Sequence, residues 1–257
     1  KVPHVFLAYT AFVSGVLVWV LGGMAVLMIG LPFFPGTMGV YLLVVVLAAL
    51  GWHIYRGSWR VRRAEAVAVL GVFGLFVLLA VSAQAAKLAY ATYDSFMQLA
   101  LGQFLATDTH PDFVRKHLGL WGIITPLTHA PAYWFGEEFF FTVQPAFGYT
   151  LFSTFAYSCY RGMFRVLQLP DHPQLRWLVG VAVAVLVTPF FSIMSSVVVH
   201  NNIAAAAFLF PSVALLWMAH VEEKPGYLGL ILFFLLGFSL SRSITLIYGL
   251  VVLSIII

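Results

Sequence analysis

Long apolar runs separated by short polar stretches dominate this chain. Crossing a bilayer as an α-helix takes roughly 20 apolar residues, and about seven stretches reach or approach that length. They cover residues 5–30, 38–55, 66–91, 142–160, 177–198, 203–220 and 227–250. No run of about ten residues alternates polar and apolar side chains in the way that membrane barrel strands do. The pattern therefore predicts an all-α, polytopic transmembrane helical bundle.

Composition supports the same class. Hydrophobic residues make up 62% of the chain and charged residues only 9%, and the mean hydropathy is +1.00. A soluble domain needs a larger charged surface, so lipid is expected to be the solvent for much of this protein. The net charge of +4 suits a membrane protein and does not indicate a nucleic-acid partner. With Cys159 as its single cysteine, the chain has no internal disulfide and no Cys-based metal site.

Most basic residues fall in loops that alternation assigns to one membrane face. They are Lys1, Arg56, Arg60, Arg62, Arg63, Arg161, Arg165, Arg176 and Lys224. The positive-inside rule makes this face cytoplasmic. The basic residues that do not follow it are Lys87, Arg115, Lys116 and Arg242. The outer face then receives residues 31–37, the segment 92–141 and the short link His200-Asn201-Asn202.

Residues 92–141 form the long outer-face loop of this topology. Connections of this length are uncommon and tend to be functional. The loop concentrates acidic and histidine side chains, namely Asp94, Asp108, His110, Asp112, His117, His129, Glu137 and Glu138. Residues 96–105 place Gln98 and Gln103 among apolar side chains, which predicts a helix lying along the membrane interface. Residues 134–141 form a second such piece, with Glu137 and Glu138 among aromatics.

Each candidate site residue has a structural interpretation beside a functional one. Asp94 follows the third predicted span, where it could be a helix N-cap, a site acid, or both. Glu137 and Glu138 are a solvated pair at a helix end, or they supply a second acid beside Asp94. His110, His117 and His129 match no metal-binding motif, so no metal site is predicted.

Cationic and amide side chains near the outer face also have two interpretations. Arg242 lies within the seventh predicted span, where a charge is costly. It reaches the headgroups by snorkelling, or it binds a phosphate through its planar fork of donors. Lys87 allows the same two interpretations. In the His200-Asn201-Asn202 link, the asparagines cap a helix or their amides line a cavity.

Taken in order, these stretches resemble the GT-C superfamily of membrane glycosyltransferases, which take sugars from polyprenyl-phosphate donors. In that family an acid follows a span on the outer face, an amphipathic helix and a proline-rich stretch come next, and an Asn-Asp pair opens an alanine-rich span. A glycine-rich span with a basic residue follows. The corresponding residues here are Tyr93-Asp94-Ser95 with 96–100, the stretch 126–134, His200-Asn201-Asn202 with 203–207, and Gly237 to Arg242. Asn202 stands where the family usually has Asp.

The resemblance covers about residues 66–250, and it implies an inverting sugar transfer at the outer face. Asp94 would be the general base that deprotonates the acceptor hydroxyl. Arg242 or Lys87 would stabilise the leaving polyprenyl phosphate. The implied substrate-binding residues are Lys87, His129, His200, Asn202 and Arg242. Glu137, Glu138 or His129 could orient the acceptor or hold a divalent cation, although no cofactor is predicted.

The same resemblance implies a place in the cell and a set of partners. The site would face the periplasm or the extracellular side of a bacterial plasma membrane, with membrane lipid and the polyprenyl-phosphate-sugar donor as partners. A division follows into residues 1–65, with two N-terminal spans and a basic loop, and residues 66–257, the GT-C-like core. Because the chain ends inside the apolar run Val251–Ile257, we expect it to be truncated at its C-terminus.

Two other classes of protein remain open. A non-catalytic subunit of a larger membrane complex, whose long outer loop contacts protein partners, explains the aromatic richness equally well. A transporter would place Arg242 and Lys87 in a substrate path, although the sequence contains no internal repeat or broken helix to support it.

Overall fold

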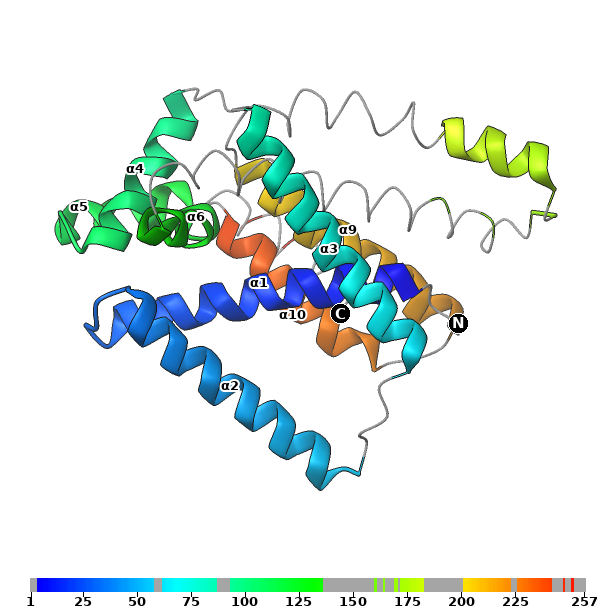
Figure 1. The fold of residues 1–257 in the computed structure, drawn as a ribbon, viewed down its shortest axis with the longest axis horizontal. Helices are drawn as coiled ribbons and strands as arrows, with labels where there is room; N and C mark the ends of the chain where they lie inside the picture. Colours follow the sequence, from blue (N-terminus) through cyan, green and yellow to red (C-terminus); the bar gives the residue numbers. More distant parts are fainter. Residues whose placement is uncertain are drawn as a thin grey trace. The chain divides into compact units, whose positions relative to one another are not determined.

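The computed structural model describes residues 4–57, 62–86, 93–135, 160, 164, 169–170, 172–182, 201–222, 226–241, 247 and 251. Within these ranges the chain is helical between short turns and contains no strand (Figure 1). The helices are α1 (His4–Met28), α2 (Pro35–Tyr55), α3 (Arg63–Ala86), α4 (Tyr93–Thr107), α5 (Pro111–Trp121), α6 (Ile124–Phe135), α9 (Asn201–Glu222) and α10 (Tyr227–Ser241). Residues 173–182 are also helical. The all-α prediction is confirmed for this part of the chain.

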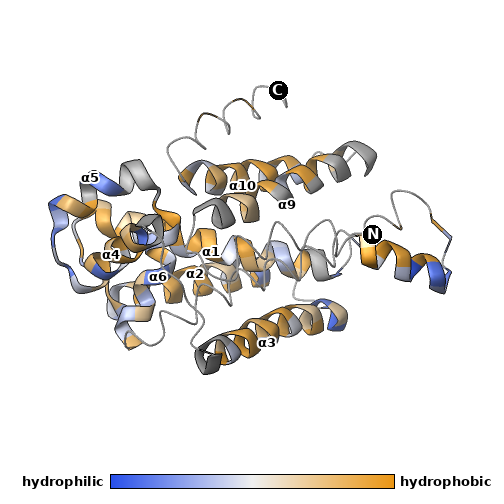
Figure 2. Cartoon of the chain, turned by 90° about the horizontal axis from the view of Figure 1, so that it is seen from above, coloured by the Kyte–Doolittle hydropathy of each residue, from blue (hydrophilic) through white to orange (hydrophobic). Residues whose placement is uncertain are grey.

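Three of these helices are long and apolar enough to cross a membrane. The qualifying segments are Leu7–Met28, Pro35–Tyr55 and Arg63–Ser82, with 22, 21 and 20 residues. At about 1.5 Å per residue, each spans roughly the 30 Å of a bilayer core. They correspond to the first three predicted spans and are apolar along most of their length (Figure 2). The other predicted spans stay predictions: α9 covers 203–220, α10 covers the first part of 227–250, and 142–160 and 177–198 lie largely outside the described residues.

Helices α2 and α3 expose large apolar side chains over most of their surface. Val40 on α2 is 64% exposed and Leu70 on α3 is 67% exposed. Met38 is the buried residue of α2, close to its start. Water would penalise such surfaces heavily, whereas lipid would not. These exposed faces are what a helix in contact with lipid presents.

The chain divides into two units that interleave along the sequence. The first contains the beginning of α1, α3 and residues 173–182. In it, the rings of Phe12 and Phe76 lie 5.9 Å apart, and an exposed ion pair of 3.9 Å joins Arg62 to Glu65 in the first turn of α3. The predicted division at residue 65 stays a prediction.

The second unit contains the rest of α1 together with α2, α4, α5, α6, α9 and α10. Helices α1 and α2 meet through the ring of Tyr41, which lies against Gly22, where any side chain would collide with it. The Tyr41 hydroxyl donates to the carbonyl of Val18 at 2.8 Å. Pro35 begins α2 with the backbone angle that a first helical turn needs. At the other end, Gly57 follows the helix with φ +58°, as a C-terminal glycine often does.

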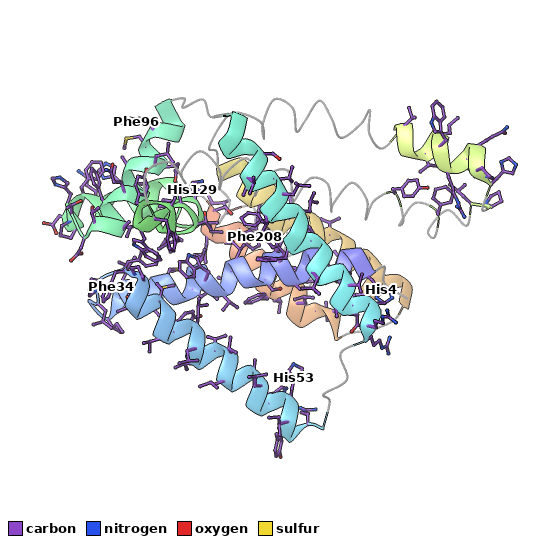
Figure 3. All side chains as sticks on the ribbon, in the orientation of Figure 1. His4, Phe34, His53, Phe96, His129 and Phe208 are labelled. Atoms are coloured by element: carbon purple, nitrogen blue, oxygen red, sulfur yellow. The ribbon has the colours of Figure 1, made fainter. Side chains whose placement is uncertain are left out.

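The predicted long outer loop is largely helical in its described part. Helices α4, α5 and α6 occupy most of residues 93–135, joined by turns in which Asp108 and His110 adopt positive φ. Helix α4 confirms a helix over residues 96–105, whereas its position along the membrane interface stays a prediction. Gln98 is 2% exposed. Phe96, which Figure 3 labels on α4, is 65% exposed. Gln98 is buried because it lies on the side of α4 that packs against α6, whereas Gln103 is exposed.

Candidate functional site

Helix α4 crosses α6 at Gly102. A Cβ atom added there would lie 3.2 Å from the carbonyl oxygen of Pro126 and 3.5 Å from the nitrogen of Ala130. Glycine therefore allows the two backbones to come into direct contact, in the way that small residues do between membrane helices. Leu101 and Leu105 on the same side of α4 are buried. The crossing is one of the tightest places in this unit.

His129 lies buried at this crossing, with 2% of its surface exposed. Its Nδ1 atom is 2.7 Å from the carbonyl oxygen of Thr125, one turn earlier in α6. A carbonyl can only accept, so Nδ1 carries the proton that forms this bond. In neutral His129 the lone pair is therefore on Nε2. The local sequence thus fixes the tautomer as well as the position of the ring.

Trp19 compensates for a proline inside α6. Pro131 has no N–H, so it cannot donate to the carbonyl of Leu127 four residues earlier. The indole Nε1–H of Trp19 donates to that carbonyl at 2.8 Å. Trp19 also packs against Phe33 and Trp134, with ring centroids 5.8 and 6.0 Å away. Helix α1 thus stabilises α6 at the Leu127 carbonyl, which has no backbone donor within α6.

Helices α9 and α10 form an antiparallel hairpin that also contacts α6. A connection of a few residues joins them, and the Phe208 ring lies on Gly237, where an added Cβ would be 2.5 Å from it. The first turn of α9 and the last turn of α10 therefore lie at the same end of the hairpin. This end meets the start of α6, because the N–H of Ile123 donates to the carbonyl of Leu240 at 3.2 Å.

The structure places three of the predicted site residues on this group of helices. His129 is at the α4–α6 crossing, and Asn202 is the second residue of α9. Asp94 is the second described residue of α4; the residues before Tyr93 lie outside the described part of the chain, so the N-cap interpretation of Asp94 stays a prediction. Eight residues separate Asp94 from Gly102, which is about 12 Å along the α4 axis.

The remaining predicted site residues lie outside the described residues. They are Lys87, Glu137, Glu138, His200 and Arg242. Their neighbours in sequence are described: α6 ends at Phe135, two residues before Glu137, and α10 ends at Ser241, directly before Arg242. Asp94 and Asn202 are placed by their helices alone.

His110 and His117 lie apart from His129, on an exposed aromatic cluster between α4 and α5. His110 packs on Phe104 with centroids 4.9 Å apart, and His117 stacks on Phe113 at 3.9 Å. The Phe104 and Phe113 rings meet at 5.7 Å. Among the described residues, no group of three His, Cys, Asp or Glu side chains is placed to hold a metal ion.

The sequence-based predictions do not single out two residues of this arrangement, Trp19 and Gln98. Trp19 lies in a predicted span, where tryptophan is ordinary, and Gln98 looked like the polar face of an interfacial helix. A proline inside a helix was the available signal for Trp19, because its missing N–H requires a donor from elsewhere. For Gln98 the signal was the nearby Gly102, which marks the side of α4 that another backbone can approach.

No known protein family, characterised protein or solved structure matches this chain. The fold itself defines the class: over its described residues this is an all-helical chain, and three of its apolar helices suit a membrane protein.

Proposed function

We propose that this protein is a membrane glycosyltransferase, which moves a sugar from a polyprenyl-phosphate donor to an acceptor at the outer membrane face. The observation that supports it best is the packing of α6 against α4, α9 and α10 in one unit. Those helices carry Asp94, His129 and Asn202, and α10 leads directly into Arg242. The sequence separates these residues widely, and a transferase site needs such groups from several elements.

In the proposed reaction, Asp94 accepts the proton of the acceptor hydroxyl as its oxygen attacks the anomeric carbon. A bond forms between that oxygen and the carbon, and the bond from the carbon to the phosphate oxygen breaks, with inversion. The electron pair leaves with the polyprenyl phosphate, beside the guanidinium of Arg242 or the ammonium of Lys87. The N-terminal end of α9, with Asn202, offers backbone N–H groups to the same phosphate.

His129 has a positioning role in this proposal. Its Nδ1–H bond to Thr125 fixes the tautomer, so that Nε2 is the acceptor atom of the neutral ring. The burial of the ring limits its motion, so the hydrogen-bond direction is set before substrate binds. Asn202, Glu137 and Glu138 contribute acceptors and donors around the sugar.

The test replaces Asp94 with Asn in protein reconstituted into liposomes with radiolabelled polyprenyl-phosphate sugars. Transfer or slow hydrolysis of the sugar is measured. We expect Asp94→Asn to lose at least a hundredfold in rate, the range for removal of a general base. Asp108→Asn is the matched control, because Asp108 is exposed in the same segment and Asn tolerates its φ of +52°. Full activity in Asp94→Asn refutes the assignment and favours the subunit interpretation.

A further inference from the structure

The C-terminal end of α2 carries an exposed cluster of aromatic and basic side chains, here named the α2 end cluster: Trp52, His53, Tyr55 and Arg56. Trp52 is 55% exposed and Tyr55 84% exposed. The guanidinium carbon of Arg56 lies 4.6 Å from the centre of the Trp52 ring, and the Trp52 and Tyr55 rings are 6.3 Å apart. None of these four residues has a role in the proposed sugar transfer.

The guanidinium of Arg56 lies over the Trp52 ring at cation–π distance. A guanidinium stacked on an indole face keeps its N–H donors along its edges, where they can form two parallel hydrogen bonds to one phosphate. The backbone is also set at this point, because the N–H groups of Arg56 and Gly57 donate to the carbonyls of Trp52 and Ile54, both at 3.0 Å. Part of the entropy cost of ordering Arg56 is therefore met before any ligand binds.

The charge of the cluster is not balanced by the chain around it. No Asp or Glu precedes Glu65 in the sequence, whereas Arg56, Arg60, Arg62 and Arg63 all lie within residues 56–63. Glu65 pairs with Arg62 at 3.9 Å. Within the described part of the chain, no carboxylate comes within ion-pair distance of Arg56. An anion from outside the chain would complement the charge of Arg56.

We propose that the α2 end cluster binds the headgroup of an anionic phospholipid, with Arg56 forking onto the phosphate and Trp52 and Tyr55 in the interfacial layer. The position of the cluster selects a lipid over a soluble anion. It ends a 21-residue apolar helix whose flanks are exposed, and indole and phenol rings favour the boundary between acyl chains and headgroups. A basic group beside such a helix gains about 1 kcal/mol from an anionic leaflet. This proposal does not depend on the glycosyltransferase activity.

The experiment uses the purified full chain in detergent, mixed with equal amounts of phosphatidylglycerol and phosphatidylcholine of identical acyl chains. Native mass spectrometry measures the ratio of the two lipids retained as single adducts. We expect the wild-type chain to prefer phosphatidylglycerol and Arg56→Gln to reduce that preference about fivefold, which corresponds to 1 kcal/mol. Arg56→Lys should lie between the two, because it keeps the charge but loses the planar fork.

Lys116→Gln is the matched control. It removes the same charge from an exposed site on α5, where Asp112 lies one turn away on the same helix. We expect it to leave the lipid ratio unchanged. Trp52→Leu keeps every charge and removes the ring under Arg56, so it should lower the ratio of phosphatidylglycerol to phosphatidylcholine. This variant keeps the proposal testable if Arg56→Gln does not fold. A wild-type ratio in the variants of the cluster, or equal losses in Arg56→Gln and Lys116→Gln, overturns the proposal.

Discussion

Replacing Trp19 with Phe should destabilise α6 because the carbonyl of Leu127 loses its hydrogen-bond donor. The indole N–H supplies the 2.8 Å bond to Leu127 that Pro131 cannot make, and Leu127 is 0% exposed, so water has no access to take its place. A buried polar group left without its partner costs about 1–3 kcal/mol. Phenylalanine keeps much of the ring contact with Phe33 and Trp134, so we expect most of the loss to come from the hydrogen bond.

A second substitution separates the hydrogen bond from the packing. Pro131→Ala restores an N–H that can donate to Leu127 within α6, so the carbonyl no longer depends on Trp19. Trp19→Phe should therefore cost about 1–2 kcal/mol less in the Pro131→Ala background than in the wild type, and this difference is the coupling energy of a double-mutant cycle. The four proteins are compared by thermal or denaturant unfolding in one detergent.

The control for this cycle is Phe33→Leu. Phe33 contacts Trp19 at 5.8 Å but makes no bond to Leu127, so its cost should be the same with Pro131 or Ala at that position. Equal costs of Trp19→Phe in the two backgrounds would refute the reasoning, because the indole would then act through packing alone.

Other substitutions test the α4–α6 crossing and His129. Gly102→Ala should destabilise the protein by about 1–3 kcal/mol by forcing the added Cβ against the Pro126 carbonyl, whereas Gly39→Ala, with nothing within 4 Å, should be neutral or stabilising in the same unfolding assay. A similar effect from both would exclude a tight crossing. His129→Asn keeps a donor near the Nδ1 position and removes Nε2; we expect a loss of about 1–2 kcal/mol in unfolding from the smaller buried side chain and about a tenfold loss of sugar transfer, the value of one hydrogen bond. His129→Gln, which keeps a group near Nε2, should retain more activity, and the reverse order would contradict the positioning role.

The sequence predicts the α1–α3 helices closely, because their signal is local. The predicted spans 5–30 and 38–55 agree with His4–Met28 and Pro35–Tyr55 to within a few residues. The third, 66–91, overlaps Arg63–Ala86, and its last residues lie outside the described part of the chain. Each is a long apolar run bounded by Pro, Gly or Arg, so composition alone determines where the helix lies. The basic residues that follow α2 can likewise be identified from the sequence alone.

Features that depend on distant residues were not predictable. Trp19 and Leu127 lie 108 positions apart, and nothing near either one indicates the other. The periodicity of residues 96–105 suggested an amphipathic helix but not its orientation: a glutamine faces inward because Gly102 turns that side of α4 toward α6.

Helix α2 is joined to α1 near the turn between them, through Tyr41 and Gly22, and its later residues expose their apolar side chains. A helix held at one end is free to lean, and its inclination is then governed by the thickness of the hydrocarbon layer around it. In a thin bilayer α2 would tilt further, and in a thick one it would stand more upright. Trp52 and Arg56 at its far end would stay at the headgroup plane, so the α1–α2 angle would report membrane thickness.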